Sequence, residues 1–300
     1  IEFGMPMYGQ LYPEPYSFKY PKAGEQNAFV ELYVYHTDAG KKVKVDIGTE
    51  KDQYIPRIKW TQNSNKLAVM RMNRLQNQLD VLFVEAGTGN SEVVLTEKEE
   101  AYIDEVTNSK WRFLENGDEF LWQSEANGHN HLYLYSMGGE QIRQITKGDW
   151  DVTEIAAVDE PNGKIYFVST EPSPLERHLY SITLEGKKKK QLTKEAGWHS
   201  VTFSDGNSYY MDSYSTAGMP GTSALYTSSG KQVEVLEDNA RLKKTMAQYD
   251  LTVPEFFEFT TSEDVKLNGW MIKPADFDPN KKYPVLQYVY GGPGSQTVKN

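Results

Sequence analysis

The sequence predicts a mostly β protein, built from repeated four-stranded units and followed by a region of a different kind. Short apolar and aromatic segments come in groups of four that recur at roughly 45 to 50 residues, the period of four-stranded propeller blades. Aromatic residues make up 13% of the 300 residues, including 20 tyrosines, which favours strands over helices. A third observation agrees, since only one segment has a convincing helical pattern.

Composition excludes several classes of function. The 32 basic and 42 acidic residues give a net charge of −10, which argues against a nucleic-acid partner because phosphate binding needs a basic face. Cysteine is absent, so neither disulfides nor thiolate metal sites are available. No apolar run approaches the roughly 18 residues needed for a transmembrane helix, and no cofactor or metal is expected.

Residues 1–28 are predicted to form an extended arm or edge strand. Prolines at positions 6, 13, 15 and 21 exclude helix interiors and central strands. Exposed aromatics among these prolines make the arm a candidate contact element.

Residues 29–237 are predicted to form four blades and part of a fifth. Residues 29–35 and 42–45 supply the outer half of a preceding blade. The four full units cover about 57–96, 111–146, 155–193 and 201–236. Each carries a turn rich in Asn, Asp or Gly between its first two strands, at residues 63–65, 116–118, 161–163 and 205–206. Because an open run of blades leaves strand edges exposed, further blades are expected before residue 1.

Residues 238–253 are predicted to form a linker helix, with Asp238 or Asn239 as its N-cap and Leu242, Met246 and Tyr249 on one face. Residues 254–272 then give two strands about a turn at 262–264.

The last segment carries the strongest functional signal. Val285, Leu286, Tyr288, Val289 and Tyr290 form an apolar run that stops at the glycine-rich residues 291–294. This pattern predicts a buried strand that runs into a turn, and in α/β sheets catalytic groups gather at such strand ends.

Residues 270–296, which contain the Val-Tyr-Gly-Gly-Pro-Gly motif at 289–294, resemble the opening of the α/β-hydrolase domain in the prolyl oligopeptidase family of serine peptidases. The dipeptidyl peptidase IV branch is the closer match. The resemblance implies that residues 254–300 are the first strands of a truncated α/β-hydrolase domain. It also implies that Tyr290 is catalytic, donating a hydrogen bond to the oxyanion.

The same resemblance implies an activity for the parent protein: removal of N-terminal dipeptides, Xaa-Pro or Xaa-Ala, from peptide substrates by a serine nucleophile. The Gly-x-Ser-x-Gly elbow that would carry this serine is absent from the sequence, so we expect a catalytically incomplete fragment. It further implies a homodimer formed through the arm at 1–28. By resemblance, a periplasmic or extracellular location is favoured over a cytoplasmic one.

Other candidate residues favour structural roles. His129 and His131 form a His-x-His pair, but no third metal ligand is suggested by spacing. Residues 187–190 are four lysines at a hairpin tip, typical of a solvated turn. Glu97, Glu99 and Glu100 are predicted to lie in a solvated loop at a blade junction.

Two alternatives remain open. An acylaminoacyl peptidase or oligopeptidase of the same family would share the fold but cleave at a different position. A non-catalytic propeller would bind protein or carbohydrate, with the C-terminal segment serving only as a decorating strand pair.

Overall fold

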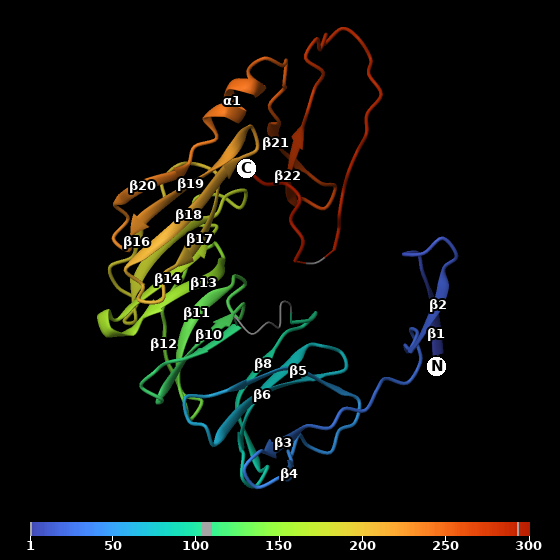
Figure 1. Ribbon diagram of the computed structural model, residues 1–300, viewed down its shortest axis with the longest axis vertical. Coiled ribbons are helices and arrows are strands. Elements are labelled where there is room, and N and C mark those ends of the chain that lie inside the picture. The colour runs from blue at the N-terminus through green and yellow to red at the C-terminus, as the bar shows by residue number, and fades with distance from the viewer. Residues whose placement is uncertain (1, 104–109, 293) are drawn as a thin grey trace. The chain divides into compact units, whose positions relative to one another are not determined.

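The computed structural model describes residues 2–103, 110–292 and 294–300, and confirms the mostly β architecture (Figure 1). The chain forms two compact units, residues 1–106 and 107–300, and each is described by itself. Among the described residues, no helix is long and apolar enough to span a bilayer.

The described residues of the first unit form eight strands. They are β1 (Glu2–Met7), β2 (Glu14–Lys19), β3 (Tyr33–His36), β4 (Lys41–Lys44), β5 (Gln53–Trp60), β6 (Lys66–Asn73), β7 (Gln78–Glu85) and β8 (Ser91–Lys98). Strands β5 to β8 form one four-stranded antiparallel sheet in chain order, and β1–β2 and β3–β4 are separate two-stranded pairs.

In the second unit, the residues that the structure describes form three four-stranded sheets. They contain β9 (Trp111–Phe113), β10 (Glu119–Ser124), β11 (His131–Ser136) and β12 (Gln141–Gln144), then β13 (Val152–Asp159), β14 (Lys164–Ser169), β15 (His178–Thr183) and β16 (Lys190–Gln191), then β17 (Trp198–Phe203), β18 (Tyr209–Thr216), β19 (Met219–Thr227) and β20 (Gln232–Glu237). A 3-10 helix, η2 (Glu160–Asn162), joins β13 to β14. With the sheet of the first unit, these are the predicted four blades.

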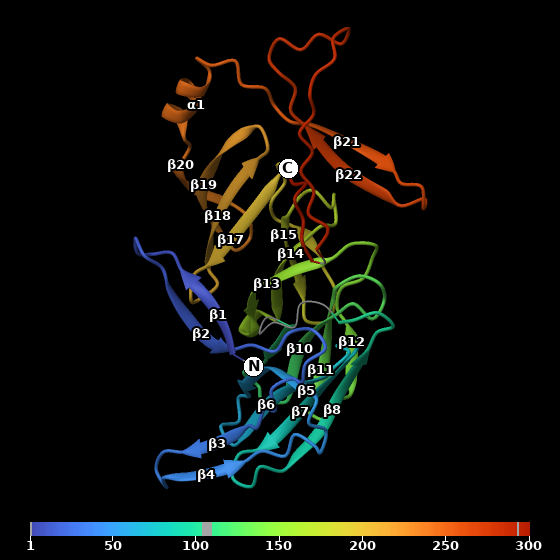
Figure 2. The same cartoon turned by 90° about the vertical axis from the view of Figure 1, so that its right-hand side faces the viewer.

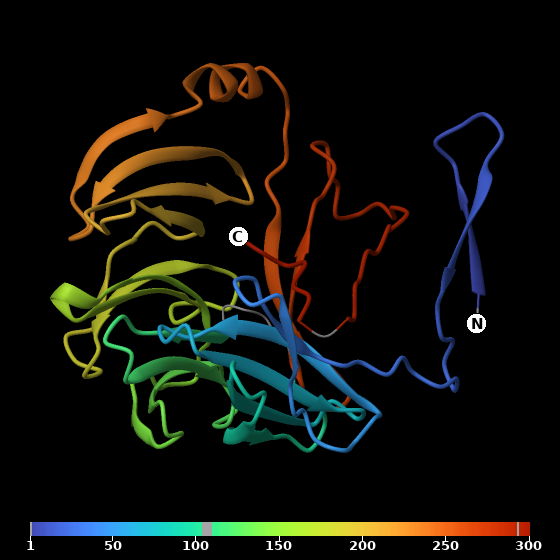
Figure 3. The same cartoon turned by 60° about the horizontal axis from the view of Figure 1, so that its bottom comes forward.

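The N-terminal arm is an antiparallel hairpin rather than a single extended segment. Pro6 lies opposite Pro15 in the β1–β2 register. Since neither has an N–H group, the two prolines fit only a position where facing residues do not exchange backbone hydrogen bonds. Figures 1 and 3 show this hairpin standing apart from the β5–β8 sheet.

The pair β3–β4 packs on the β5–β8 sheet, as expected for the outer half of a preceding blade. Their shared core contains Val34 from β3 and Val45, which directly follows β4. The sheet contributes Val69, Leu82 and Val84. Burial of both faces explains why β6 and β7 are almost continuously apolar.

Strand β14 shows how consecutive blades of the second unit are joined (Figure 2). Ile165 and Phe167 belong to the core shared with the β9–β12 sheet. Tyr166 and Val168 belong to the core shared with the β17–β20 sheet. Because successive side chains point to opposite faces of a strand, this sheet is buried on both sides.

The C-terminal part contains helix α1 (Ala240–Met246) and the hairpin β21 (Glu255–Thr260) and β22 (Lys266–Met271). Asn239 occupies the N-cap position of α1 without a side-chain cap bond, while Asp238 accepts from the Ala240 N–H at 2.8 Å. The predicted turn at 262–264 joins β21 to β22, and Asp264 has a φ of 59°. The hairpin is a two-stranded sheet of its own, separate from the three four-stranded sheets of the second unit (Figure 2).

Candidate functional site

The predicted strand at residues 285–290 is wrong as a secondary-structure assignment. This segment is extended but pairs with no neighbour among the described residues. The exposed fractions of Leu286 and Tyr288 are 96% and 78%. A strand is held by hydrogen bonds to an adjacent strand and by side chains packed on its faces, and the described residues supply neither here.

Tyr290 lies at the end of this segment, and its ring lies beside the following turn. A Cβ atom on Gly292 would lie 2.6 Å from Tyr290 Cε1, so the ring lies directly beside this glycine. Gly294 has a φ of 66°, in the left-handed region, and Ser295 N–H donates to Gly292 O at 3.3 Å. Pro293 of the motif lies outside the described residues.

The Tyr290 side chain is 59% exposed. Within the described part of the chain its hydroxyl has no hydrogen-bond partner. The hydroxyl is therefore an available donor beside a turn in which Gly294 has a left-handed φ.

The residues after the turn are attached to the loop before β15. Arg177 Nη2 donates to Gln296 Oε1 at 2.6 Å, and Gln296 Nε2 donates to Pro174 O at 2.7 Å. Asn300 N–H donates to Leu175 O at 2.9 Å. These contacts, which we call the tail anchor, join positions 119 or more residues apart in sequence.

Arg177 is itself held by the blade. Its guanidinium lies 4.3 Å from the centre of the Trp198 ring and donates to Pro174 O and Glu176 O. Its backbone bridges to Trp198 at the start of β17. The tail anchor therefore rests on the blade, and it fixes the chain six residues after Tyr290 at Gln296.

The sequence did not indicate the tail anchor. Gln296 ends the motif that carries the family resemblance, but no local pattern assigns it a partner. Arg177 precedes β15 in a segment whose composition is that of an ordinary loop. Only the tertiary contact brings the two together.

Both ring nitrogens of His131 have hydrogen-bond partners. Its Nδ1 lies 3.0 Å from Thr146 Oγ1 and its Nε2 lies 2.9 Å from Gly148 O. Burial lowers the pKa of His131, and the hydrogen bond to Gly148 only partly opposes this. His129 lies in the preceding loop, 3.4 Å from Asp151, so the two imidazoles serve separate structural contacts.

The same arrangement recurs in the next blade. His178 is followed by Leu and Tyr as His131 is, and Thr193 lies 15 residues after His178 as Thr146 does after His131. Thr193 Oγ1 accepts from Leu179 N–H at 2.9 Å. These paired threonines and histidines are a structural feature of the repeat.

The remaining charged candidates have surface roles. Lys187 to Lys190 are exposed, as predicted for a solvated turn, although Lys189 pairs with Glu171 at 2.5 Å. Glu97 lies in β8 opposite Leu79 rather than in a loop, because the strand continues to Lys98. Within the described ranges, no group of three or more His, Cys, Asp or Glu side chains is placed to hold a metal ion.

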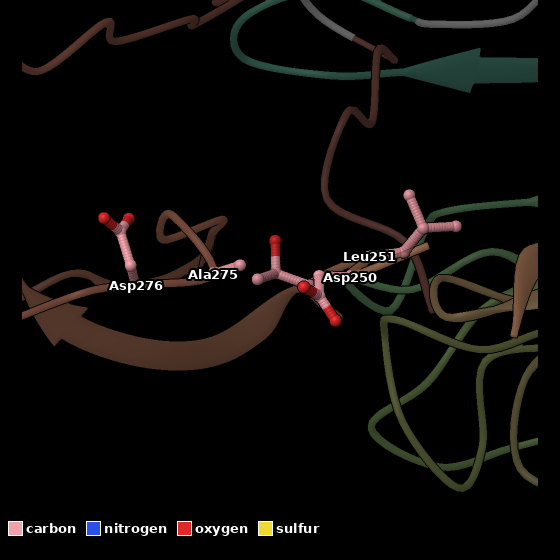
Figure 4. Close-up of a pocket in the computed structure, with 5 residues that line it drawn as sticks. Asp250, Leu251, Ala275 and Asp276 are labelled. Carbon is pink, nitrogen blue, oxygen red and sulfur yellow. The ribbon is translucent and has the colours of Figure 1, made fainter. Parts of the chain in front are cut away.

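A surface hollow of about 430 Å³ lies between the end of the linker and the segment after β22. Its lining includes Asp250, Leu251, Ala275 and Asp276. Figure 4 shows the two carboxylates on opposite sides of Ala275, directed at no common point. The hollow is therefore a poorer candidate for chemistry than the Tyr290 turn.

Comparison with known proteins gives a consistent result. A family model for the dipeptidyl peptidase IV (DPP IV) N-terminal region matches residues 2–221. A probable dipeptidyl-aminopeptidase B from Emericella nidulans is 34% identical over 307 residues, which cover 96% of this chain and 33% of that protein. A dipeptidyl peptidase 4 from Arthroderma otae is 31% identical, over 96% of this chain and 38% of that protein.

The crystal structure of Porphyromonas gingivalis dipeptidyl peptidase 4 superposes with a TM-score of 0.91 and 38% identity, over all of this chain and 42% of that one. The chain therefore spans between about a third and two-fifths of the length of these relatives.

Proposed function

The chain belongs to the family of the dipeptidyl peptidase IV N-terminal region, and we propose on this basis that it is part of a serine exopeptidase that releases N-terminal dipeptides from peptides. The preferred second residue would be proline or alanine. Residues 1–300 contain no Gly-x-Ser-x-Gly elbow, so this stretch would be inactive by itself. Serine, acid and histidine are proposed to lie beyond residue 300.

Tyr290 is proposed to donate a hydrogen bond to the oxyanion. When a serine attacks the scissile carbonyl, the carbonyl oxygen gains negative charge. A fixed donor binds this oxyanion more strongly than it binds the uncharged carbonyl oxygen of the substrate, and this difference speeds the reaction. The observation that supports this role is the available Tyr290 hydroxyl beside a turn in which Gly294 has a left-handed φ of 66°.

The exposed apolar run before Tyr290 supports the same proposal. Val285, Leu286 and Val289 are 76% to 96% exposed, which is unusual for side chains of this kind in a row. A hydrolase sheet would bury such a run between neighbouring strands and covering helices. The tail anchor at Gln296 would hold the other end of the turn on the propeller blade, and so limit the positions open to Tyr290.

The hairpin β1–β2 is proposed to mediate a homodimer. It carries exposed apolar side chains, including Tyr8, Leu11 and Tyr12, each at least 79% exposed. Apolar groups at the tip of a projecting hairpin are a suitable contact surface for a second copy. A periplasmic or extracellular location is proposed from the same family membership.

The decisive experiment uses the full-length protein and chromogenic substrates. We expect hydrolysis of Gly-Pro and Gly-Ala derivatives with free N-termini, and none of acetyl-Ala derivatives. Tyr290→Phe should lower kcat by about 10²- to 10³-fold, which corresponds to about 2.7–4 kcal/mol of lost transition-state stabilisation.

Tyr288→Phe is the matched control, since it removes a hydroxyl two residues away, from a ring that is also exposed. It should leave kcat unchanged. Cleavage of acetyl-Ala substrates in preference to Gly-Pro would favour the acylaminoacyl peptidase alternative. An unchanged kcat in Tyr290→Phe would remove the proposed role of this residue.

A further inference from the structure

Arg177 connects a propeller blade to the chain beside Tyr290. Its guanidinium donates to Gln296 Oε1 at 2.6 Å, and Gln296 Nε2 donates to Pro174 O at 2.7 Å, in the loop that carries Arg177. Because a guanidinium only donates and a carbonyl oxygen only accepts, the amide of Gln296 fits this loop in one orientation. The two bonds therefore define both the position and the orientation of the Gln296 side chain.

The guanidinium of Arg177 is held by further contacts of its own. Nη1 donates to Pro174 O at 3.1 Å and to Glu176 O at 2.7 Å. The guanidinium carbon lies 4.3 Å from the centre of the Trp198 ring. A planar fork of donors that is already held in place loses little freedom when it forms one more bond. Arg177 is thus suited to support a residue of another segment.

The backbone of Arg177 lies where two blades meet. Its N–H donates to Gly197 O, and its carbonyl oxygen accepts from His199 N–H, each at 3.1 Å. Arg177 directly precedes β15, while Gly197 directly precedes β17 and His199 lies within it. A change of side chain leaves backbone groups in place, so a variant at position 177 can lose the guanidinium and keep these two bonds.

A short path leads from Gln296 to Tyr290. Ser295, the neighbour of Gln296 in sequence, donates its N–H to Gly292 O at 3.3 Å. The Tyr290 ring lies beside Gly292, since a Cβ atom there would lie 2.6 Å from Tyr290 Cε1. On the other side of Tyr290, residues 285–289 pair with no strand in the described part of the chain. The contact at Gln296 is therefore the nearest hydrogen-bonded attachment of this turn to a blade among the described residues.

The tail has a second attachment beyond Gln296. Lys299 Nζ lies 4.6 Å from the centre of the Trp198 ring, and Asn300 N–H donates to Leu175 O at 2.9 Å. An ammonium group at this distance is attracted by the face of an indole ring. Because these contacts do not involve Gln296, loss of the Gln296 contact should loosen the turn without detaching the whole tail.

We propose that Arg177 is a positioning residue for the oxyanion donor: through its bond to Gln296 it sets where the Tyr290 hydroxyl lies. This role rests on the proposed function of Tyr290, and it adds that a residue of the propeller controls that function. A donor stabilises the transition state only when it lies where the negative charge develops. Arg177 therefore acts on kcat by way of Tyr290 and not by contact with the substrate.

The test uses the full-length protein and a Gly-Pro chromogenic substrate. Arg177→Met keeps an apolar stem against Trp198 and removes the guanidinium. We expect kcat to fall about tenfold, less than for loss of the Tyr290 hydroxyl, because a displaced donor still forms part of its bond. KM should stay within about twofold, since the donor acts on the transition state. Arg241→Met, the same change at an exposed position of α1, is the control and should alter neither constant.

The Tyr290→Phe background separates positioning from a general structural defect. If Arg177 acts through the Tyr290 hydroxyl, Arg177→Met should cause no further fall in kcat once that hydroxyl is absent. An equal fall in both backgrounds, or no fall in either, would overturn the proposed role. Gln296→Met breaks the same contact from the tail and leaves the blade unchanged, so it should give the same pattern even where Arg177→Met folds poorly.

Hydrogen exchange distinguishes a failure of this role from a failure of the proposed function. The bonded N–H of Ser295 should exchange faster in Arg177→Met and Gln296→Met than in Arg241→Met, with or without peptidase activity. Unchanged exchange at Ser295 would overturn the positioning role. Faster exchange in a protein that cleaves no Gly-Pro substrate would remove the peptidase function and leave Arg177 as a support of the turn.

Discussion

Thr146→Val removes one hydroxyl from the buried centre of the first blade in the second unit. Thr146 is 2% exposed, and its Oγ1 accepts from Leu132 N–H at 3.0 Å. His131 Nε2 lies 2.9 Å from Gly148 O, an acceptor, so Nε2 carries the proton and Nδ1 accepts. The Thr146 hydroxyl therefore donates to His131 Nδ1 at 3.0 Å, and the single oxygen serves two buried groups.

The expected cost follows from those two groups. Valine keeps the shape of threonine, so little packing is lost, but Leu132 N–H and His131 Nδ1 both lose their partner while remaining buried. Each buried group left without a partner costs about 1–3 kcal/mol, and the pair together should lower the free energy of unfolding by about 2–6 kcal/mol.

Urea unfolding followed by tryptophan fluorescence measures this loss. Trp150 lies edge-on to His131 with ring centres 4.9 Å apart, so it reports on this site. The urea concentration at the unfolding midpoint should be lower in Thr146→Val than in the wild type, while the m-value stays constant. Thr202→Val, on the exposed side of β17, is the control and should remain within about 0.5 kcal/mol of the wild type. A Thr146→Val effect as small as that of the control would refute the assignment of two bonds to one hydroxyl.

Two further predictions concern the tail anchor and the buried histidines. Gln296→Ala should speed hydrogen exchange in residues 294–300, because it removes the acceptor of Arg177 Nη2 and so about 1.5–3 kcal/mol of stabilisation of the tail anchor. Thr297→Ala, at an exposed position, is the control and should leave the exchange rate unchanged. Equal exchange rates in the two variants would contradict the tail anchor. The pKa of His131 is lowered by folding, so its neutral form is required and stability should fall as the pH drops below about 6.5. Burial opposes the charge on His199, but the hydrogen bond to Asp212 outweighs burial and raises the pKa of His199, so its contribution is complete below about 6.5 and is lost as the pH rises through its folded value. The measurement is the free energy of unfolding as a function of pH for the wild type, His131→Asn and His199→Gln. The difference between wild type and variant should change with pH in opposite directions for the two histidines. Curves for both variants that run parallel to the wild-type curve would refute both assignments.

The blades were predictable because their signals are local. The apolar run at residues 164–168 indicates a strand buried on both faces, and β14 is buried against two sheets. Turn residues such as those at 116–118 and 161–163 mark where the chain reverses. Repetition of these short signals at a near-constant spacing was sufficient to indicate four blades, since each strand pairs with its neighbour in sequence.

The site depended on contacts that no local pattern records. Arg177 meets Gln296, and His199 meets Asp212, through the way strands and loops come together in space. The segment at 285–290 has the composition of a strand, yet it forms none, because strand formation requires a neighbour to share its hydrogen bonds. Sequence by itself determined the repeat, the blade strands and the family motif around Tyr290. Tertiary structure decided which polar groups meet, because hydrogen-bond partners are set by three-dimensional packing and not by distance along the chain.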